Sequence, residues 1–229
     1  MLILGIDTSG KTASAALFDT EIEVFLAQNT LYTQKTHSQV IMPICRDLLK
    51  QTDRQMSDIG LFAVANGPGS YTGLRIGAAV VKAMGFALDC KCCGVSTLEA
   101  MAYNNIVFSG TVCSVMKARG ELVYSCTYKS DGYTLEPICD EQLINRNELA
   151  QFLAFNGEKT LLCGDGAADF FTDYRSAEFL IASPANRLQN AAGVCLAALS
   201  KKPITVDELE ISYLQKVKAE KDLETRNKK

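Results

Sequence analysis

The stretch from Leu2 to Asn29, "LILGIDTSGKTASAALFDTEIEVFLAQN", decides the fold class. It contains three apolar segments, at residues 2–7, 12–19 and 21–29, which short polar turns separate. Short runs rich in Ile, Leu, Val and Phe between polar turns are typical of β-strands. We therefore predict that the chain begins with three consecutive strands.

After these strands the pattern changes to alternating helices and strands. Residues 38–50 carry apolar side chains at helical spacing, and Pro43 must lie near the start of this helix or kink it. The next predicted elements are a buried strand at 59–67, a helix from about 73 to 88, a short strand at 92–96 and a helix that Ser96 or Thr97 caps. This order predicts an α/β fold.

The same pattern restarts near residue 110. Strands are predicted at "TVCSVM", "LVYSCTYK" and "TLEPICDEQLI", followed by a helix at 147–155, a strand at 160–164 and a helix at 186–199. Both halves thus begin with three strands, which favours two related lobes, each a mixed sheet with helices. We place the first lobe at 1–106, the second at 107–213 and a charged tail, expected to be disordered, at 214–229.

Composition argues against several classes of protein. The net charge of −3 disfavours direct binding of nucleic acid by this chain alone, because such binding needs a basic face. No run approaches the roughly 18 apolar residues of a membrane span, and the first residues lack the basic segment of a signal peptide, so we expect a cytoplasmic protein without membrane contact. The nine cysteines are expected to be reduced and buried, and the "CKCC" cluster at 90–93 lacks the CxxC spacing of a metal site.

The loop "GPGSYTG" at 67–73 resembles phosphate-binding loops but matches none of their patterns. It lacks the lysine of a Walker loop, the third glycine of a dinucleotide-binding loop and the GxSxG of a nucleophile elbow. Two interpretations remain open: anion binding at the N-terminus of the following helix, or a tight turn that glycine permits.

His37 is the chain's single histidine. Motifs with two histidines, such as HExxH, are therefore excluded, and we predict no metal ligands. A Ser/His/Asp triad would have to use His37, but its position at the start of a helix favours packing or capping.

Asp7, Thr8 and Ser9 form a further candidate site. A carboxylate and hydroxyls at the end of a first strand are how actin-like and sugar-kinase-like folds present their first phosphate loop. The corresponding turn of the second half, "KARGE" at 117–121, has Lys117 where an acid is needed, so the symmetric clamp looks broken. The alternative is that Asp7 and Ser9 only satisfy their own turn. The candidate nucleotide-binding or anion-binding set is Asp7, Thr8, Ser9, Gly67, Gly69, Ser70 and Thr72.

The helix predicted at 73–88 is apolar on every side, since Arg75 and Lys82 are its only charged residues. Such a helix must be covered on every side, by its own sheet on one face and by a second cover on the other. Its glycines would let another helix approach closely, and with the helix at 38–50 it would form half of a four-helix bundle. A protein interface is favoured, and complete burial within the monomer is the alternative.

Five segments of the sequence, in chain order, carry a family resemblance: "ILGIDTS", "HSQVIMPICRDLL", "ANGPGSYTGLRIGAAVVKAMGFAL", "CCGVSTLEAMA" and "KARGELVY". They resemble the bacterial TsaB (YeaZ) family of the glycoprotease-like ASKHA superfamily, chiefly over residues 1–125. The resemblance implies an actin-like, ribonuclease H-like fold of two lobes. It also implies a role in making threonylcarbamoyladenosine (t6A) at position 37 of ANN-decoding tRNAs.

The resemblance further implies a non-catalytic subunit that pairs with the catalytic TsaD, with the ATPase TsaE in the larger complex and with itself when alone. This chain would need no cofactor, ATP and metal would bind to the partner subunits, and tRNA would be contacted only through the complex. In the family the helices that match 38–50 and 73–88 form the interface. The residues thus predicted to bind the partner are His37, Val40, Ile41, Ile44, Leu48, Gly73, Leu74, Ile76, Gly77, Val80, Val81 and Met84.

The chain departs from the family pattern at two places. Lys117 stands where members usually carry an acid, and "ISYLQ" at 211–215 replaces the usual PxYLR. The first departure argues against nucleotide binding in the cleft. Two alternatives to the scaffold role remain: an ATP-binding actin-fold enzyme of kinase or ATPase type that uses the Asp7-Thr8-Ser9 turn, and a plain homodimer outside any larger complex.

Overall fold

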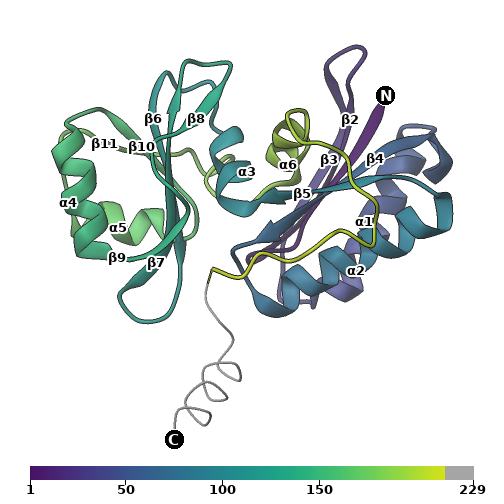
Figure 1. Cartoon of the computed structure of the whole chain (residues 1–229), viewed down its shortest axis with the longest axis horizontal. Coiled ribbons are helices and arrows are strands. Elements are labelled where there is room, and N and C mark those ends of the chain that lie inside the picture. Colours follow the sequence, from purple (N-terminus) through teal and green to yellow (C-terminus); the bar gives the residue numbers. More distant parts are fainter. Residues whose placement is uncertain (215–229) are drawn as a thin grey trace, which may run out of the picture.

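The computed structural model describes residues 1–214. Apart from Leu214, the predicted charged tail at 214–229 lies outside the described residues. Two lobes lie side by side in Figure 1, one built around β1 to β5 and the other around β6 to β11. Within residues 1–214 there is no helix that is both long and apolar enough to cross a bilayer.

The sheet of the first lobe has the strand order β3-β2-β1-β4-β5. Its first three strands pair antiparallel, and β4 and β5 continue the sheet parallel to β1. The three strands predicted at the start of the chain are therefore confirmed. The strand bounds are β1 Leu2–Asp7, β2 Thr12–Asp19, β3 Val24–Tyr32, β4 Ile59–Gly67 and β5 Cys92–Ser96.

Helices cover both faces of this first sheet. On one face α1 (His37–Gln51) and α2 (Tyr71–Leu88) form a core with alternate residues of β1 and β4, and a short 3-10 helix, η1 (Met56–Asp58), follows α1. On the other face α3 (Thr97–Tyr103) and α6 (Ala191–Ala198) pack on the intervening residues. Because side chains alternate along a strand and helices cover both faces, β1 is buried on both sides: all six of its residues are buried, and Leu2–Ile6 are apolar or glycine.

The sheet of the second lobe repeats the arrangement of the first. Its order is β11-β10-β6-β7-β8; β6, β7 and β8 are antiparallel neighbours, β10 and β11 run parallel to β6, and β9 also pairs with β7. Three antiparallel strands followed by two parallel ones in each lobe are the actin-like fold that the sequence predicts. The bounds are β6 Gly110–Lys117, β7 Leu122–Ser130, β8 Leu135–Pro137, β9 Gln142–Asn145, β10 Thr160–Cys163 and β11 Phe179–Ile181.

The helices of the second lobe are shorter than those of the first. On one face of its sheet, α4 (Arg146–Asn156) and α5 (Ala167–Asp173) pack around Phe170, while α3 packs on the other face and so joins the two lobes. The single strand predicted over "TLEPICDEQLI" is in fact two strands, β8 and β9, which residues 138–141 separate. The sequence patterns did not predict α5 or β11.

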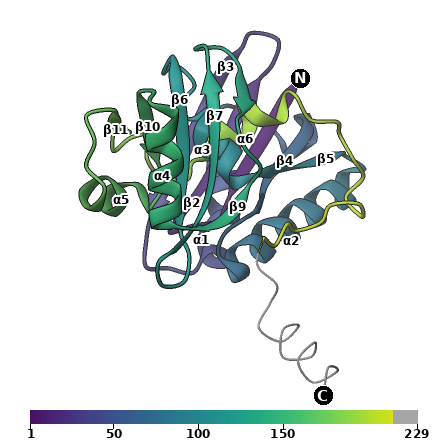
Figure 2. The same ribbon diagram turned by 60° about the vertical axis from the view of Figure 1, so that its left-hand side comes forward.

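The C-terminal part of the chain returns to the first lobe. Helix α6 packs with Ile3 and Ala16, Ile204 bridges to Cys92 of β5, and the amide of Ser212 donates to the carbonyl of Asn66 over 2.8 Å. Figure 2 shows this last segment running past α2. The assignment of 186–213 to the second lobe was therefore wrong. Sequence order suggested it, but the small side chains of α6 allow this helix to lie directly on β1.

Candidate interaction surface and interlobe cleft

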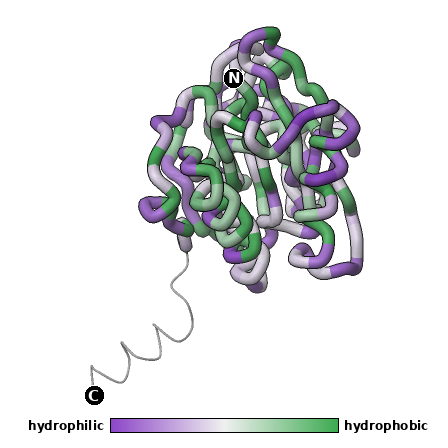
Figure 3. The backbone as a smooth tube through the Cα atoms, turned by 90° about the vertical axis from the view of Figure 1, so that its right-hand side faces the viewer, coloured by the Kyte–Doolittle hydropathy of each residue, from purple (hydrophilic) through white to green (hydrophobic). Residues whose placement is uncertain are grey.

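The outward side of α2 is apolar and open to solvent. Leu74 and Val81 on its inward side are fully buried against the sheet, whereas Phe86 on its outward side is 80% exposed. Between these extremes Ile76 and Val80 are half-buried, and Ala79, Ala83 and Ala87 are exposed. Figure 3 faces this end of the molecule and shows hydrophobic residues along its helical coils. The sheet covers one side of the helix, and Tyr213 of the C-terminal segment packs on Tyr71 and Arg75 at its start. Within residues 1–214, Ala79, Ala83, Phe86 and Ala87 remain exposed.

A groove of about 590 Å³ runs between this side of α2 and the neighbouring helices. We call it the outer-face groove; no charged side chain lines it. Next to it, a second hollow along α1 is bordered by Arg46, Lys50 and Arg54. The surface therefore has an apolar centre with a basic border. The residues that line the outer-face groove are Met42, Met56, Ala79, Val80, Ala83, Met84, Ala87 and Leu88.

Most of the residues predicted to bind a partner face the lobe's own core instead. The apolar stripe of α1 lies on the sheet, because the sheet is the nearest large apolar surface to cover it. Ile76 and Val80 are half-buried on the outward side, Met84 reaches the groove although it is only 7% exposed, and His37 is half-buried. The prediction is corrected for the residues that lie in the core of the lobe and do not line the groove: Val40, Ile41, Ile44, Leu48, Leu74 and Val81.

The glycines of α2 also face inward. A Cβ at Gly73 would lie 2.0 Å from the carbonyl oxygen of Thr8, and one at Gly77 would lie 2.6 Å from the Thr8 hydroxyl. Both positions need glycine so that α2 can pack directly on the turn after β1. The prediction that these glycines receive a partner helix is therefore wrong.

His37 connects the start of α1 to the turn after β1. Its Nε2 atom lies 2.8 Å from the carbonyl oxygen of Gly10, and its Nδ1 atom is buried without a hydrogen-bond partner among the described residues. This is the packing role that the position at a helix start predicts. Within residues 1–214 there is no group of three or more His, Cys, Asp or Glu side chains that could hold a metal ion.

An interlobe cleft of about 590 Å³ separates the turn after β1 from the turn after β6. Of the predicted nucleotide set, Ser9, Gly69 and Ser70 line it. Asp7, Thr8 and Gly67 are buried and do not line the cleft, nor does the exposed Thr72, so the predicted set is only partly brought together. The full lining is Ser9, Gly10, Lys11, Gly69, Ser70, Met116, Lys117, Ala118, Arg119, Tyr124 and Asp165.

Asp7 is fully buried and is engaged by its own turn. Its Oδ1 atom accepts hydrogen bonds from the Ser9 amide at 2.9 Å and from the Ser9 hydroxyl at 2.6 Å. Burial raises the pKa of Asp7 to about 6, against the opposing effects of the Ser9 hydrogen bonds and of nearby His37. A carboxyl group in this state satisfies its turn and does not face the cleft, as the structural interpretation of Asp7 and Ser9 predicts.

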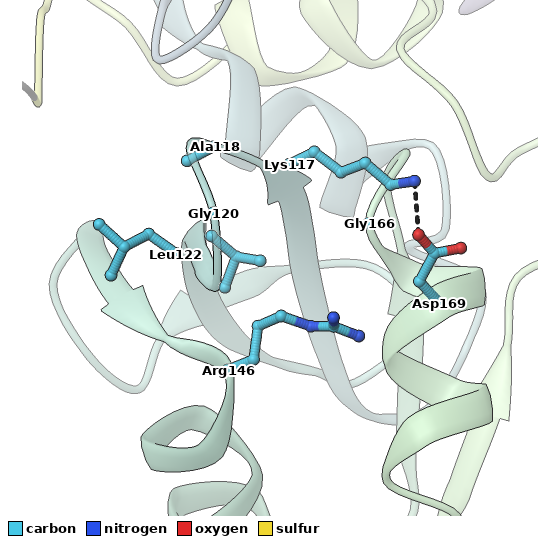
Figure 4. A pocket seen from close by; sticks show the side chains of 8 residues that line it. Lys117, Ala118, Gly120, Leu122, Arg146, Gly166 and Asp169 are labelled. Carbon is cyan, nitrogen blue, oxygen red and sulfur yellow. Dashed lines mark ion pairs between the residues drawn. The ribbon is translucent and has the colours of Figure 1, made fainter.

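The turn after β6 is occupied by ion pairs. The Lys117 ammonium lies 2.5 Å from the Asp169 carboxylate, as Figure 4 shows, and the Lys117 amide donates to Asp165 over 2.9 Å. The hydrogen bond from Lys117 lowers the pKa of Asp169. Arg146 projects into the same small pocket, of about 100 Å³, and pairs with Asp173. Asp169 and Asp173 are therefore paired with basic side chains, while Asp165, which lines the cleft, accepts a hydrogen bond from a backbone amide.

The loop at 67–73 packs against the turn after β1. The Ser70 amide donates to the carbonyl of Ser9 over 2.7 Å, and the Ser70 hydroxyl caps α2 by accepting from the Gly73 amide over 3.2 Å. Gly67 has a φ of +134° and lies against the backbone of Ser212, where a Cβ would come within 2.0 Å of the carbonyl oxygen. Of the two interpretations, the tight turn that glycine permits fits this packing.

Comparisons with known proteins agree with this fold. A family model described as "TsaD: tRNA N6-adenosine threonylcarbamoyltransferase" matches residues 27–202. The TsaB protein of Bacillus subtilis, a "tRNA threonylcarbamoyladenosine biosynthesis protein", is 29% identical over 96% of both chains. The chain belongs to the family that this TsaD model describes, and within it the chain is similar to TsaB proteins. The match extends well past residue 125, so the likeness to TsaB covers more of the chain than its motifs indicated.

Two further proteins are similar to this chain. The TsaB protein of Escherichia coli K12 is 32% identical over 57% of this chain and 56% of its own length. The solved structure of YeaZ from Pseudomonas aeruginosa superposes with a TM-score of 0.80, at 21% identity over 93% of this chain and 99% of that one. At that identity the superposition shows the shared two-lobed fold.

Proposed function

We propose that this TsaB-family protein acts in the biosynthesis of threonylcarbamoyladenosine in tRNA as a non-catalytic subunit that binds a TsaD partner. The observation that carries the proposal is the outer-face groove, an apolar surface on α2 with no cover in residues 1–214. A groove of this kind fits the apolar side of a partner helix. The names of the curated TsaB relatives supply the pathway.

The scaffold role is also supported by the contacts of the candidate catalytic residues, which engage them within this chain. Asp7 is held inside its own turn, Lys117 replaces the second acid of the clamp, and His37 packs against Gly10. We expect the transfer chemistry, together with the ATP and metal that it uses, to belong to the partner subunits. With a net charge of −3, this chain would meet tRNA only within the complex.

Docking at the outer-face groove would order the partner and, with it, the partner's active site. The basic border formed by Arg46, Lys50 and Arg54 favours a partner surface with an apolar centre and acidic edges. The same groove would serve a second copy of this chain when the partner is absent. TsaE would join the larger complex at another surface.

The test is a charge placed in the groove. Val80→Glu in the full-length chain should weaken binding to TsaD of the same cell by at least about a hundredfold, because an unpaired buried charge costs several kcal/mol at an interface. Ala83→Glu is the second variant, because Ala83 is exposed and its replacement leaves the core intact. The matched control is Phe155→Glu on α4, where a 91% exposed apolar side chain of the second lobe is replaced.

Binding is measured by calorimetric titration of TsaD, and function by a tRNA modification assay with and without this chain. Both groove variants should lose binding and stimulation together, while Phe155→Glu keeps both. Unchanged affinity for TsaD in both groove variants would contradict the proposal. Micromolar binding of Mg-ATP to the isolated chain would instead support the alternative of an ATP-binding enzyme.

A further inference from the structure

Cys126 of β7 and Cys139, two residues after β8, lie opposite each other across the second sheet. The last pair of the β7–β8 ladder joins Tyr128 to Pro137, and the Ile138 amide then donates to the carbonyl of Thr127 over 2.8 Å. The next pair in this register is Cys126 with Cys139. In an antiparallel ladder hydrogen-bonded and non-hydrogen-bonded pairs alternate, and the Cα atoms of a non-hydrogen-bonded pair are about 4.5 Å apart. Cys139 lies in the bend that follows β8, and a continuation of the register into this bend brings the pair into the range of about 4.4–6.8 Å that disulfides span.

The two thiols interact directly and differ in exposure. The Cys126 thiol donates a hydrogen bond to the Cys139 carbonyl oxygen over 3.2 Å. Cys126 is only 1% exposed, whereas Cys139 is half-buried. The neighbouring Cys126 thiol lowers the pKa of Cys139 to about 6, and the same interaction raises the pKa of Cys126. The more accessible thiol is therefore also the one with the lowered pKa, and the second thiol is buried beside it.

The other cysteines lack this combination. All nine are free thiols, and burial raises the pKa of Cys45, Cys93 and Cys163 to about 12. Cys90 is the only other cysteine that is not fully buried, and burial raises its pKa as well. The expectation that the cysteines pack as small apolar residues therefore fits most of them but leaves the pair in the second lobe unexplained.

We propose that Cys126 and Cys139 form a dithiol site that hydrogen peroxide oxidises to an intramolecular disulfide. The site lies in the second lobe and does not depend on the proposed binding of TsaD. Cys139 is the attacking residue, because its sulfur is accessible, and Cys126 is the resolving residue, because its sulfur is already in place.

The chemistry balances in two steps. In the first, the Cys139 thiolate attacks peroxide, an S–O bond forms, the O–O bond breaks, and the released hydroxide takes up the thiol proton to leave as water. In the second, the Cys126 sulfur attacks the resulting sulfenic acid, an S–S bond forms, the S–O bond breaks, and the Cys126 proton leaves with the hydroxide as water. The two thiols lose two electrons in total, and peroxide accepts both.

The disulfide would restrict a segment that lies close to the contact between the two lobes. It would fasten residues 138–141, the irregular segment between β8 and β9, to the middle of β7. Glu141 in this segment lies close to Ser96 of the first lobe. Oxidation would therefore reduce the freedom of a segment that touches both lobes.

The experiment is oxidation of the full-length folded chain by hydrogen peroxide at pH 7, followed by alkylation of the remaining thiols and peptide mapping by mass spectrometry. The expected product is a peptide pair joined through Cys126 and Cys139, with an intact mass lower by two hydrogen atoms and restored by dithiothreitol. Before oxidation, N-ethylmaleimide should label Cys139 at least about fivefold faster than Cys90, since the larger thiolate fraction outweighs its lower nucleophilicity.

Three variants sharpen the test. Cys126→Ala should stop the reaction at the sulfenic acid of Cys139, which dimedone traps, and Cys139→Ser should abolish the joined peptides. Cys90→Ser is the matched control, with a half-buried thiol of the first lobe removed, and should leave the product unchanged. If the folded chain gives no Cys126–Cys139 product, or links Cys139 to another cysteine instead, the proposal is overturned. Circular dichroism of each variant checks that it is folded.

Discussion

The two lobes share one strand order, but the equivalent positions at the ends of β1 and β6 carry residues of opposite charge type, an acid in the first lobe and a lysine in the second. After β1 the acid Asp7 is completely buried, and α2 lies so close that Gly73 touches the Thr8 backbone. After β6 the equivalent turn holds Lys117 in a half-exposed ion pair, and a Cβ at Gly120 would meet nothing within 4 Å. A duplicated fold therefore does not by itself preserve a duplicated site: one turn is closed by packing and the other by charge.

The outer helices of the lobes differ in the same way. In the first lobe α2 is long enough to cover its sheet and still present the continuous outer-face groove, whereas in the second lobe α4 is shorter and exposes Phe155 as a single apolar side chain. Isolated apolar residues are common on protein surfaces, and contiguous apolar patches mark interfaces. This difference supports the assignment of partner binding to the first lobe.

The largest expected difference in the free energy of unfolding comes from adding one methyl group beside the first turn, on α2, and one within the second turn. Gly73→Ala places a Cβ 2.0 Å from the Thr8 carbonyl oxygen, a backbone atom that cannot easily move, and should lower the free energy of unfolding by about 3 kcal/mol. Gly120→Ala meets no neighbour and should cost only about 1 kcal/mol, for its φ of +64°. Urea unfolding of both variants measures the difference. Equal costs would show that the two turns are packed alike.

The next effect is the pH dependence that Asp7 gives to the first lobe. Its pKa is raised from 3.8 to about 6, so between these values the native state holds a proton that the unfolded state has released. The free energy of unfolding should therefore fall as the pH rises from about 4 to about 6, by up to about 3 kcal/mol, and level off above that range.

Asp7→Asn is the variant that isolates this contribution. The amide oxygen can still accept both hydrogen bonds from Ser9 but does not titrate, so this part of the slope should disappear. The quantity to compare is the difference in the free energy of unfolding between wild type and variant at each pH. Exposed acids with lowered pKa values, such as Asp169, make the stability rise with pH in both proteins, and this contribution cancels in the difference. Identical pH profiles of unfolding for the two proteins would rule out a buried, protonated Asp7.

Much of the fold can be predicted from the sequence, because the spacing of apolar residues identifies a buried helix or strand. The strands at the start of the chain, α1, α2 and the Ser96 cap of α3 lie where their patterns predict, within a few residues. The elements that escaped prediction are short: α5 has seven residues, and β11 is a three-residue strand at the edge of the second sheet. The return of α6 to the first lobe depends on contacts between residues about 190 apart, such as Cys195 against Gly5, which no local pattern encodes.

The sequence assigned partner binding to the helices at 38–50 and 73–88, but most of the residues it named on them lie in the core of the first lobe. An all-apolar helix such as α2 does not reveal which side meets the sheet, so Leu74 and Val81 were assigned to the partner when they belong to the core. A usable signal was available: Gly73 and Gly77 share one side of the helix, and small residues mark the closest approach to a sheet. Ala79 and Ala83 on the opposite side are then the outward residues.

The smallest effect concerns the ion pair of the second turn. Lys117 and Asp169 are about half exposed, so Lys117→Ala should lower the free energy of unfolding by no more than about 1 kcal/mol. It should also return the pKa of Asp169 toward its ordinary value, because the hydrogen bond from Lys117 is the main cause of its depression. An Asp with a lowered pKa stabilises the fold above its unfolded pKa and loses that contribution as the pH falls, so the effect of Lys117→Ala should vanish in acid. NMR titration of Asp169 and urea unfolding at neutral and acidic pH measure both consequences. A loss as large as that of Gly73→Ala would mean that packing, rather than charge, closes the second turn as well.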